Sequence, residues 1–487
     1  MKEKYIRAAS WILTAGFIAV FLFCCTSPAL WFDEQYSVCM ARHPYGRIIQ
    51  NTALDVHPPL YYFILRAAGQ LASWLPLPQQ LVAAKVVSVF PMALAMVLGC
   101  TWVARLFDRR AGLFFVVCMG CTPQMAAYGT EVRMYSWGLL FMVVCALSAF
   151  EWLRTGRHSM VAAMALSAAA CLYTQYWAGM AAGIFLGLLV VYGWVIRRQT
   201  DKGVLVAGVA ALLLFAPWAP VALRQTVGTR STGGQHTPLS LYLVRGYFEF
   251  VFSSGWGVVT LLFLGTLMAA GCSFLFNRKK SAQSWHAFLC VAALGGLLLV
   301  GMAAQAFLQP TRVIFQGRYI FPCLGVFWLG ISVWLAGLQP RALRGAALSV
   351  LFMVGIVQGA RALETLGQDW KEYSEWKAVS QQLEDGGGFL AVDHIAAAAV
   401  RCYLPQAHCA VLGQQEAQDT FSRVFEVSPQ ADTAHWKGNI WLALQGEDIS
   451  DEAVENLARQ GYTAGKIHSV SWGGSPYLFV LMEESGG

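Results

Sequence analysis

The segment WILTAGFIAVFLFCCTSPALWFDEQYS, residues 11–37, decides what kind of protein this is. It begins as an apolar run that ends at Cys25, and it then passes into an acidic pair, Asp33 and Glu34. An apolar helix of about 20 residues crosses the hydrocarbon core of a membrane. The alternative is a signal peptide cleaved near residues 26–29. The many apolar runs that follow favour an uncleaved first span, with the two carboxylates where that span meets water.

The composition points to a membrane protein. Of the 487 residues, 57% are hydrophobic and 13% are charged, whereas a soluble domain carries about 25% charged residues. The net charge of +7 is spread over small basic clusters between apolar runs, which is typical of membrane loops rather than of a nucleic-acid surface. Membrane lipids are therefore expected partners, and nucleic acid is not.

The apolar runs predict an all-α polytopic membrane domain over residues 1–363 with about eleven transmembrane helices. The expected spans are residues 9–27, 85–104, 112–127, 134–152, 159–175, 178–196, 204–222, 256–276, 286–308, 319–338 and 345–362.

Basic residues set the expected orientation. With a cytoplasmic N-terminus, every predicted inner segment is basic, as the positive-inside rule requires. The clusters are Lys2, Lys4 and Arg7; Arg105, Arg109 and Arg110; Arg154 and Arg157; Arg197, Arg198 and Lys202; Arg278, Lys279 and Lys280; Arg341 and Arg344. Residues 60–75 are apolar but contain Arg66 and Gln70, and a span there would invert every later loop. We therefore interpret them as an amphipathic helix in the outer interface, within a first outer loop of residues 28–84. The expected location is a bacterial inner or plasma membrane.

Residues 364–487 are more polar and predict a small extracytoplasmic α/β domain, because an odd number of spans places them outside. Helices are expected at 369–383, 395–403 and 451–460, and strands at FLAVD, 408–412, 440–444 and 476–482. The 13 cysteines form no disulfide framework. Cys402 and Cys409 share a polar region, and sequence alone leaves their pairing open.

The first outer loop carries the acidic candidates. Asp33 is well placed to act as a general base, although an Asp in this position also commonly caps a helix. His57 precedes Pro58-Pro59, which stiffens the backbone and orients the imidazole. Tyr61 follows in the same motif. Candidates for a divalent metal are Glu34, Asp55 and His57; a metal is possible, and no cofactor is certain.

The later outer segments carry cations. YGTEVRMY contains Tyr128, Glu131, Arg133 and Tyr135, and GRY contains Arg318 and Tyr319. Lys85 and Gln175 are expected on the same face. Each cation alone could extend its head group to lipid phosphates. Converging on one pocket, they would bind a phosphate ligand.

The order of the motifs carries a family resemblance over residues 10–340. The motifs occur in this order along the chain: WFDEQYS, HPPLYY, Lys85, RLFDRRAG, YGTEVRMYSW, LYTQYWAG, FAPWAPVALRQ and GRYIFP. This series resembles bacterial glycosyltransferase family 39-type proteins of the glycosyltransferase-C superfamily, relatives of protein O-mannosyltransferases and lipid A aminoarabinose transferases. The chain departs from the usual pattern at Lys85, where Arg is common, and in the GTEVR string.

The resemblance implies a sugar donor linked to undecaprenyl or another polyprenyl phosphate, and a lipid, glycan or protein acceptor on the outer side. Asp33 matches the acidic residue near the reacting centre. Lys85, Arg133 and Arg318 match positions that face the donor phosphate. We therefore expect Asp33 to deprotonate the acceptor, which attacks the anomeric carbon with inversion. Glu34, His57, Tyr61, Tyr128, Glu131, Tyr135, Gln175 and Tyr319 are expected to bind substrate.

Other functions fit the sequence less well. A transporter or flippase of lipid-linked sugars would place ionisable groups near the bilayer midplane, whereas here they gather at one surface. A surface polysaccharide polymerase or ligase would use the same chemistry and differ by extending its product. A structural scaffold leaves the one-sided polar clustering unexplained, and no Gly-rich phosphate loop supports a nucleotide-sugar enzyme.

Overall fold

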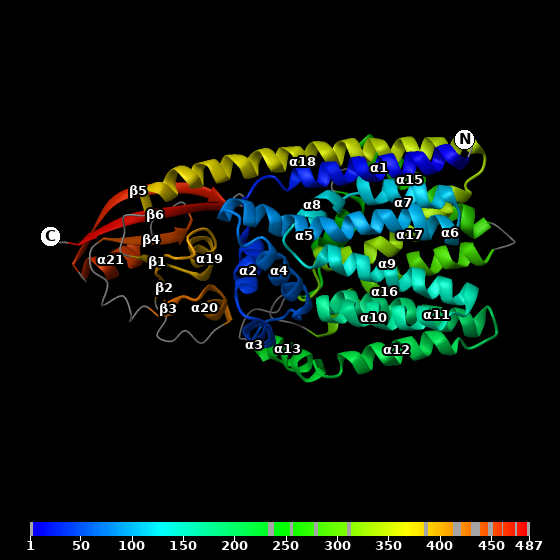
Figure 1. Ribbon diagram of the computed structural model, residues 1–487, viewed down its shortest axis with the longest axis horizontal. Helices are drawn as coiled ribbons and strands as arrows, with labels where there is room; N and C mark the ends of the chain where they lie inside the picture. Colours follow the sequence, from blue (N-terminus) through cyan, green and yellow to red (C-terminus); the bar gives the residue numbers. More distant parts are fainter. Residues whose placement is uncertain are drawn as a thin grey trace. The chain divides into compact units, whose positions relative to one another are not determined.

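The computed structural model describes residues 3–231, 238–253, 257–276, 281–308, 313–383, 388–412, 420–429, 439–446, 451–459, 461–472 and 475–484. The chain forms two compact units (Figure 1). The helical unit consists of Met1–Cys24, Val56–Tyr61 and Ser88–Ala362. The mixed unit consists of Cys25–Asp55, Tyr62–Val87 and Leu363–Gly487.

Helices coincide with all the expected spans. They are α1 (Glu3–Cys24), α5 (Leu77–Leu98, continued by η1, Gly99–Val103, and α6, Ala104–Leu106), α7 (Arg109–Cys121), α9 (Tyr135–Thr155), α10 (His158–Thr174), α11 (Tyr176–Val195), α12 (Lys202–Phe215) with α13 (Ala219–Ser231), α15 (Val258–Phe276), α16 (Ala282–Phe307), α17 (Phe321–Gly337) and α18 (Arg341–Leu383). Shorter elements are α8 (Met125–Thr130), α14 (Leu241–Phe252) and η2 (Gly317–Ile320).

The expected count of eleven spans is not confirmed. Among the described residues, eight helices are long and apolar enough to cross a membrane, and the pair α12 and α13, bent by 78°, would make a ninth. The other two expected spans are α7, with 13 residues, and α10, with 17. At about 1.5 Å per residue, α7 is roughly 20 Å long, short of a hydrocarbon core of about 30 Å.

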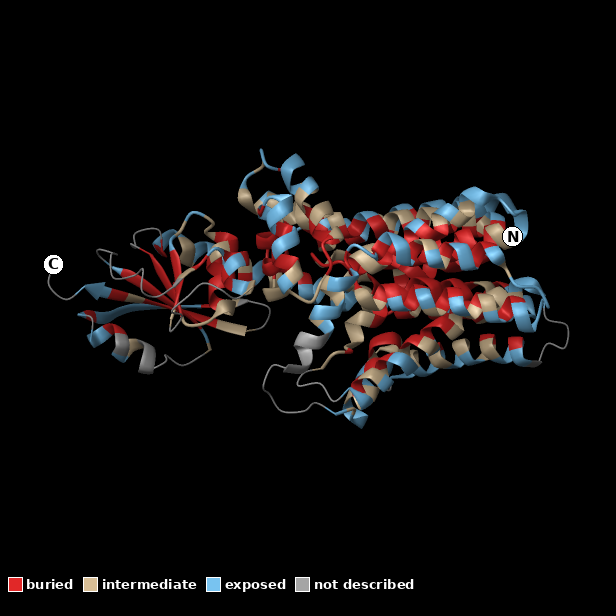
Figure 2. Ribbon diagram, turned by 90° about the horizontal axis from the view of Figure 1, so that it is seen from below, coloured by how far each residue is buried: buried red, intermediate tan, exposed pale blue. Residues whose placement is uncertain are grey.

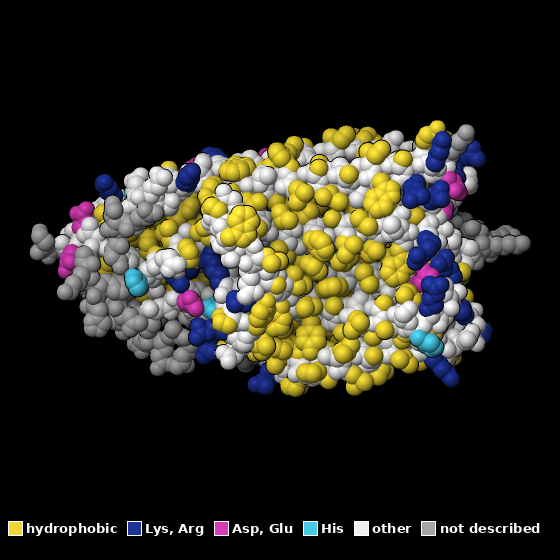
Figure 3. All heavy atoms as spheres, in the orientation of Figure 1, with side chains coloured by type: hydrophobic (Ala, Val, Ile, Leu, Met, Phe, Trp, Pro, Cys, Tyr) yellow, Lys and Arg dark blue, Asp and Glu magenta, His cyan; other side chains and the backbone are white. Residues whose placement is uncertain are grey.

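The surface of the helical unit fits a lipid environment. Hydrophobic side chains cover its visible face in a broad band (Figure 3), while buried residues fill its interior (Figure 2). Some helices approach one another closely. A methyl group at Gly330 of α17 would lie 2.5 Å from the carbonyl oxygen of Ala287 in α16. Small residues permit such close approach between helices in membranes.

Basic residues gather at the end of the helical unit that holds the N-terminus (Figure 3). Arg109 forms an ion pair with Glu3 at 3.0 Å. Buried Glu151 contacts Arg105 at 3.4 Å and Arg154 at 2.8 Å. The N-terminus and two of the predicted inner loops therefore share one end of the bundle, as the charge pattern predicts. The predicted cluster at 278–280 lies outside the described residues.

The first outer loop is more helical than the sequence suggested. It contains α2 (Phe32–Arg42), α3 (Tyr45–Leu54) and α4 (Leu60–Leu71), and α5 already begins at Leu77, eight residues before the expected span. Helix α4 agrees with the predicted amphipathic helix, and its 12 residues are too short to cross a bilayer. The start of α5 escaped prediction because its first turns contain Gln79 and Gln80, which lower the local hydropathy.

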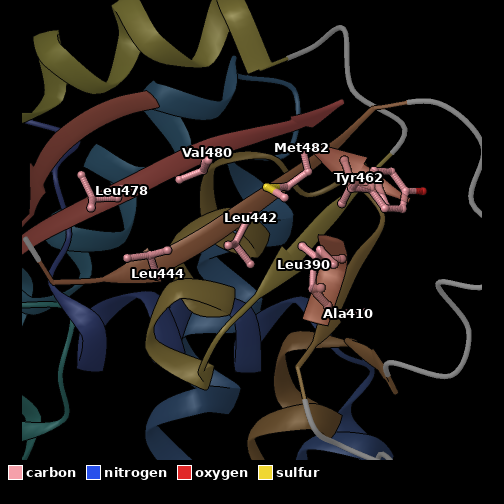
Figure 4. Packing of buried hydrophobic residues seen from close by; sticks show 10 residues of the cluster. Leu390, Ala410, Leu442, Leu444, Tyr462, Leu478, Val480 and Met482 are labelled. Atoms are coloured by element: carbon pink, nitrogen blue, oxygen red, sulfur yellow. The ribbon is translucent and has the colours of Figure 1, made fainter. Parts of the chain in front are cut away.

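The C-terminal part of the mixed unit contains a six-stranded sheet of order β3-β2-β1-β4-β6-β5. Its strands are β1 (Phe389–Ala391), β2 (Cys409–Val411), β3 (Ser428–Pro429), β4 (Ile440–Gln445), β5 (Tyr462–Trp472) and β6 (Ser475–Glu484). Strands β3, β2, β1 and β4 are parallel, and β4, β6 and β5 pair antiparallel. Leu390, Leu442 and Val480 belong to the apolar cluster on one face of this sheet (Figure 4).

The expected α/β content is confirmed with additions. Helices α19 (His394–Tyr403) and α21 (Asp451–Arg459) occupy the predicted positions, whereas α20 (Thr420–Phe425), β3 and β5 were not foreseen. The helix expected at 369–383 is the end of α18, which runs unbroken for 43 residues. In α19, Asp393 caps the N-terminus by accepting the Ala396 N–H at 2.8 Å. The four alanines that follow, residues 396–399, are at most 1% exposed.

Candidate active site

Arg133 is the centre of the site residues in the helical unit. It lies in the turn between α8 and α9 and is 3% exposed. Its Nη2 is 3.5 Å from the Nε2 of His57. The Ser88 hydroxyl donates to its backbone carbonyl at 3.5 Å. The fold therefore joins two predicted site residues that are 76 positions apart in sequence.

Tyr135, the first residue of α9, brings the second cation to the same place. Its side chain is fully buried, and Arg133, Arg318, Tyr319 and Glu131 are all near enough to act electrostatically on its hydroxyl. Arg318 and Tyr319 come from η2, just before α17. Both arginines are thus within electrostatic reach of one buried hydroxyl.

Aromatic rings form one wall beside Tyr135. The ring of Tyr128 lies 5.4 Å from that of Tyr135 and 5.4 Å from that of Phe321. Phe250 of α14 lies 5.1 Å from Tyr128. This apolar wall lowers the local dielectric, which strengthens the pull of nearby arginines on an anion.

Several buried polar side-chain atoms of the helical unit have no hydrogen-bond partner among the described residues. They include the Tyr135 hydroxyl and both ends of the Gln175 carboxamide. Gln175 is 3% exposed and joins α10 to α11. Because buried polar groups are nearly always hydrogen-bonded in native proteins, these two are well suited to contact a polar ligand.

In the mixed unit, Asp33 and Glu34 have different environments. Both lie in the first turn of α2, where negative charge is favourable. The Glu34 carboxylate accepts the backbone N–H of Trp31 at 3.1 Å, so Glu34 caps the helix and is 4% exposed. Asp33 is half-buried, and its backbone carbonyl accepts the Ser37 hydroxyl at 2.9 Å. The capping role considered for Asp33 thus belongs to Glu34.

Lys85 has a carboxylate partner in the mixed unit. Its Nζ is 3.5 Å from an Oδ of Asp369, and its side chain is 6% exposed against 27% for Asp369. Asp369 was not among the predicted site residues. The pair spans 284 positions, so no local pattern could have linked the two.

The predicted site residues divide between the two units. Asp33, Glu34, Asp55 and Lys85 belong to the mixed unit, and the helical unit holds His57, Tyr61, Tyr128, Glu131, Arg133, Tyr135, Gln175, Arg318 and Tyr319. Tyr61 is fully buried at the start of α4. Asp55 ends α3, where its backbone N–H donates to the carbonyl of Asn51 at 3.2 Å.

The metal candidates do not form a cluster. Among the described residues, no group of three or more His, Cys, Asp and Glu side chains is arranged to hold a metal ion. Glu34 is engaged as a helix cap. Metal dependence therefore stays a prediction.

A cavity of about 230 Å³ lies within the mixed unit, between α2, α4 and the start of α5. Arg66 crosses its edge, donating to the carbonyl of Arg42 at 3.0 Å. Its lining is otherwise mostly apolar. The residues identified as candidate site residues above do not line it.

The fold has counterparts among solved structures. ArnT from Cupriavidus metallidurans bound to undecaprenyl phosphate aligns with 96% of this chain and 97% of its own, at a TM-score of 0.65 and 13% identity. Its apo form aligns with 97% of this chain and 98% of its own, at a TM-score of 0.50 and 14% identity. An Archaeoglobus fulgidus oligosaccharyltransferase complex with Zn and sulfate aligns with 94% of this chain and 72% of its own, at a TM-score of 0.48 and 10% identity.

No family model and no curated protein matches the chain in sequence. The similarity to solved structures therefore concerns architecture alone. It extends over nearly the whole of both chains, including the C-terminal part. The chain therefore has the same fold as ArnT, in agreement with the fold that the resemblance in the motifs implies.

Proposed function

We propose that this protein is a multi-pass membrane glycosyltransferase that moves a sugar from a polyprenyl-phosphate donor to an acceptor on the outer face. The observation that carries the proposal is that buried Arg133 lies 3.5 Å from His57, with buried Tyr135 within electrostatic reach of both Arg133 and Arg318. A similar fold has been solved with undecaprenyl phosphate bound, which supports a donor of that class.

The arginines suit the leaving group of this reaction. As the bond between the anomeric carbon and the phosphate oxygen breaks, negative charge grows on the lipid phosphate. Arg133 and Arg318, with Lys85, would stabilise that charge in a setting where most water is excluded. The Gln175 carboxamide and the Tyr135 hydroxyl offer hydrogen bonds to phosphate or sugar oxygens.

Asp33 is the proposed general base. It takes the proton of the acceptor hydroxyl or amine, whose oxygen or nitrogen attacks the anomeric carbon from the face opposite the phosphate. One glycosidic bond forms, the bond to phosphate breaks, and the configuration inverts. A phosphate neutralised by cations leaves without a protonating acid, so one carboxylate suffices.

The test compares the two neighbouring carboxylates of α2. Asp33→Asn and Glu34→Gln are assayed in proteoliposomes supplied with a polyprenyl-phosphate sugar and a panel of outer-leaflet acceptors. We expect Asp33→Asn to lower kcat by roughly 100-fold or more, the usual range for a general base. Glu34→Gln should keep most of the turnover and fold normally, because the glutamine oxygen can still accept the Trp31 N–H.

Equal turnover of wild-type protein and Asp33→Asn would remove the base assignment. A transporter is the outcome if labelled donor crosses the bilayer with its sugar still attached. Repeated addition to one acceptor would instead identify a polymerase.

A further inference from the structure

Helices α2 and α19 of the mixed unit are joined at both ends of α2. Before its first turn, the backbone N–H of Leu30 donates to the Tyr403 hydroxyl at 2.7 Å. In its last turn, the Arg42 guanidinium donates to the carbonyl oxygens of Arg401 at 2.7 Å and Cys402 at 2.8 Å. These contacts fix the register of the two helices.

Between these contacts, two thiols are near each other. Cys39 of α2 is 3% exposed, Cys402 of α19 is fully buried, and each thiol is close enough to affect the pKa of the other. The neighbouring Cys402 thiol lowers the pKa of the Cys39 thiol, with help from the charges of Arg42 and Arg401. Burial raises the pKa of Cys402.

Cys409, the partner considered for Cys402 from the sequence, lies elsewhere. Its thiol is buried in β2 and contacts the carbonyl oxygen of Ala410 at 3.9 Å. The packing thus favours a different cysteine, one that is 363 positions away from Cys402.

We propose that Cys39 and Cys402 form a disulfide that fastens the first outer loop to the C-terminal α/β part of the chain. The proposal rests on the outer-face topology of the proposed function, because disulfides persist in oxidising compartments. It adds a covalent link that the transfer reaction itself does not require.

The bond forms by thiol–disulfide exchange with an external protein disulfide. The Cys39 thiolate attacks one sulfur of that disulfide, giving a mixed disulfide and releasing the first thiolate. Cys402 then loses its proton and attacks the Cys39 sulfur, releasing the second thiolate. Two thiols of this chain are oxidised, and the external disulfide is reduced to a dithiol. Because both thiols are buried in the fold, the exchange takes place before α2 and α19 close together.

The link would have a structural consequence for the proposed base. Asp33 lies in the first turn of α2 and Cys39 nearer its end, so a bond at Cys39 restrains the helix that carries the carboxylate. Without the link, α2 would be held by noncovalent contacts alone, among them the hydrogen bonds described above and the packing of Phe32 against Phe421.

The experiment maps thiols in the full chain purified from membranes of a host with an oxidising outer compartment. Free thiols are blocked with N-ethylmaleimide in denaturant, and the protein is digested with and without prior reduction. We expect a peptide carrying Cys39 to be joined to one carrying Cys402 in the unreduced sample only. The joined species should vanish in Cys39→Ser and persist in Cys409→Ser, a matched change of another buried thiol in the same unit.

Two results would overturn the proposal. One is quantitative labelling of both Cys39 and Cys402 in the unreduced wild-type protein. The other is a joined pair with a different composition, such as Cys402 with Cys409. The map of the wild-type protein stands without any variant, and it uses no sugar transfer, so its failure is distinct from a failure of the proposed function.

Discussion

Tyr135 has a buried hydroxyl that the protein itself leaves without a hydrogen-bond partner among the described residues. Replacing an unsatisfied buried group by an apolar one of the same shape is nearly neutral for stability. We therefore expect Tyr135→Phe to unfold at the wild-type temperature or slightly above it, while donor KM rises several-fold. Thermal unfolding in detergent and steady-state kinetics measure the two effects.

Tyr247→Phe is the matched control. The Tyr247 hydroxyl is also inside the helical unit, but it donates to the carbonyl of Phe315 at 2.7 Å. Its loss should lower stability by about 1 kcal/mol without a comparable rise in donor KM. The reverse pattern, with Tyr135→Phe the less stable variant and normal in KM, would contradict a ligand-binding role for Tyr135.

A second prediction concerns the effect on donor KM of replacing either member of the Lys85–Asp369 ion pair. Lys85→Gln removes a cation assigned to the donor phosphate, so donor KM should rise roughly tenfold, which corresponds to about 1.4 kcal/mol. Asp369→Asn keeps the cation and loses only its partner at 3.5 Å, so its KM should change less. Titration of each variant with donor lipid compares them. Larger damage from Asp369→Asn would assign the pair a structural role.

For the secondary-structure elements, hydropathy predicted the positions of the helices more accurately than it predicted which helices are long enough to span a membrane. All the expected spans coincide with helices, because a run of apolar side chains favours the same backbone in any apolar setting. Hydropathy did not predict that α7 ends at Cys121, because the polar turn that follows hardly changes the average hydropathy of residues 112–127. It did predict the length of α10, which has 17 residues like the expected span at 159–175. Helices α2 and α3 lack a long apolar run and owe their order to packing, such as the Arg42 contacts with α19.

The candidate site, too, could be predicted only in part from the sequence. The motifs pointed to Arg133, Arg318 and Tyr135 as site residues, because each is marked by local polarity at the end of an apolar run, and their role stays a prediction. Asp369 lies in a mixed polar helix with many similar residues around it. Only the folded chain distinguishes it from them.

The close contact between α16 and α17 leads to a prediction about how these two helices pack. Gly330→Ala places a methyl group 2.5 Å from the carbonyl oxygen of Ala287, whereas a methyl group at Gly295 of α16 meets nothing within 4 Å. We expect Gly330→Ala to cost about 1–3 kcal/mol by overpacking and Gly295→Ala to cost little. Thermal unfolding of the two variants compares them, and equal stability would indicate that α16 and α17 separate without penalty.

For the whole molecule, the basic end of the helical unit predicts on which side of the membrane each terminus lies. Arg105, Arg109 and Arg154 share that end with the N-terminus, and basic loops stay in the cytoplasm. An epitope tag before Met1 should therefore be reached by antibody only after the inner membrane is permeabilised. A tag after Gly487 should be reached once the cell wall and any outer membrane are opened. Both tags on one side would contradict an odd number of spans.

Helix α19 differs from most helices of soluble domains, which keep one face for solvent. Its alanines at 396–399 point in every direction around the axis, and all of them are enclosed. Substitutions at these four positions are therefore constrained on every side of the helix. In a saturation scan, tolerance there should follow side-chain volume rather than position around the helix, with glycine and serine surviving best and leucine failing at each of the four sites.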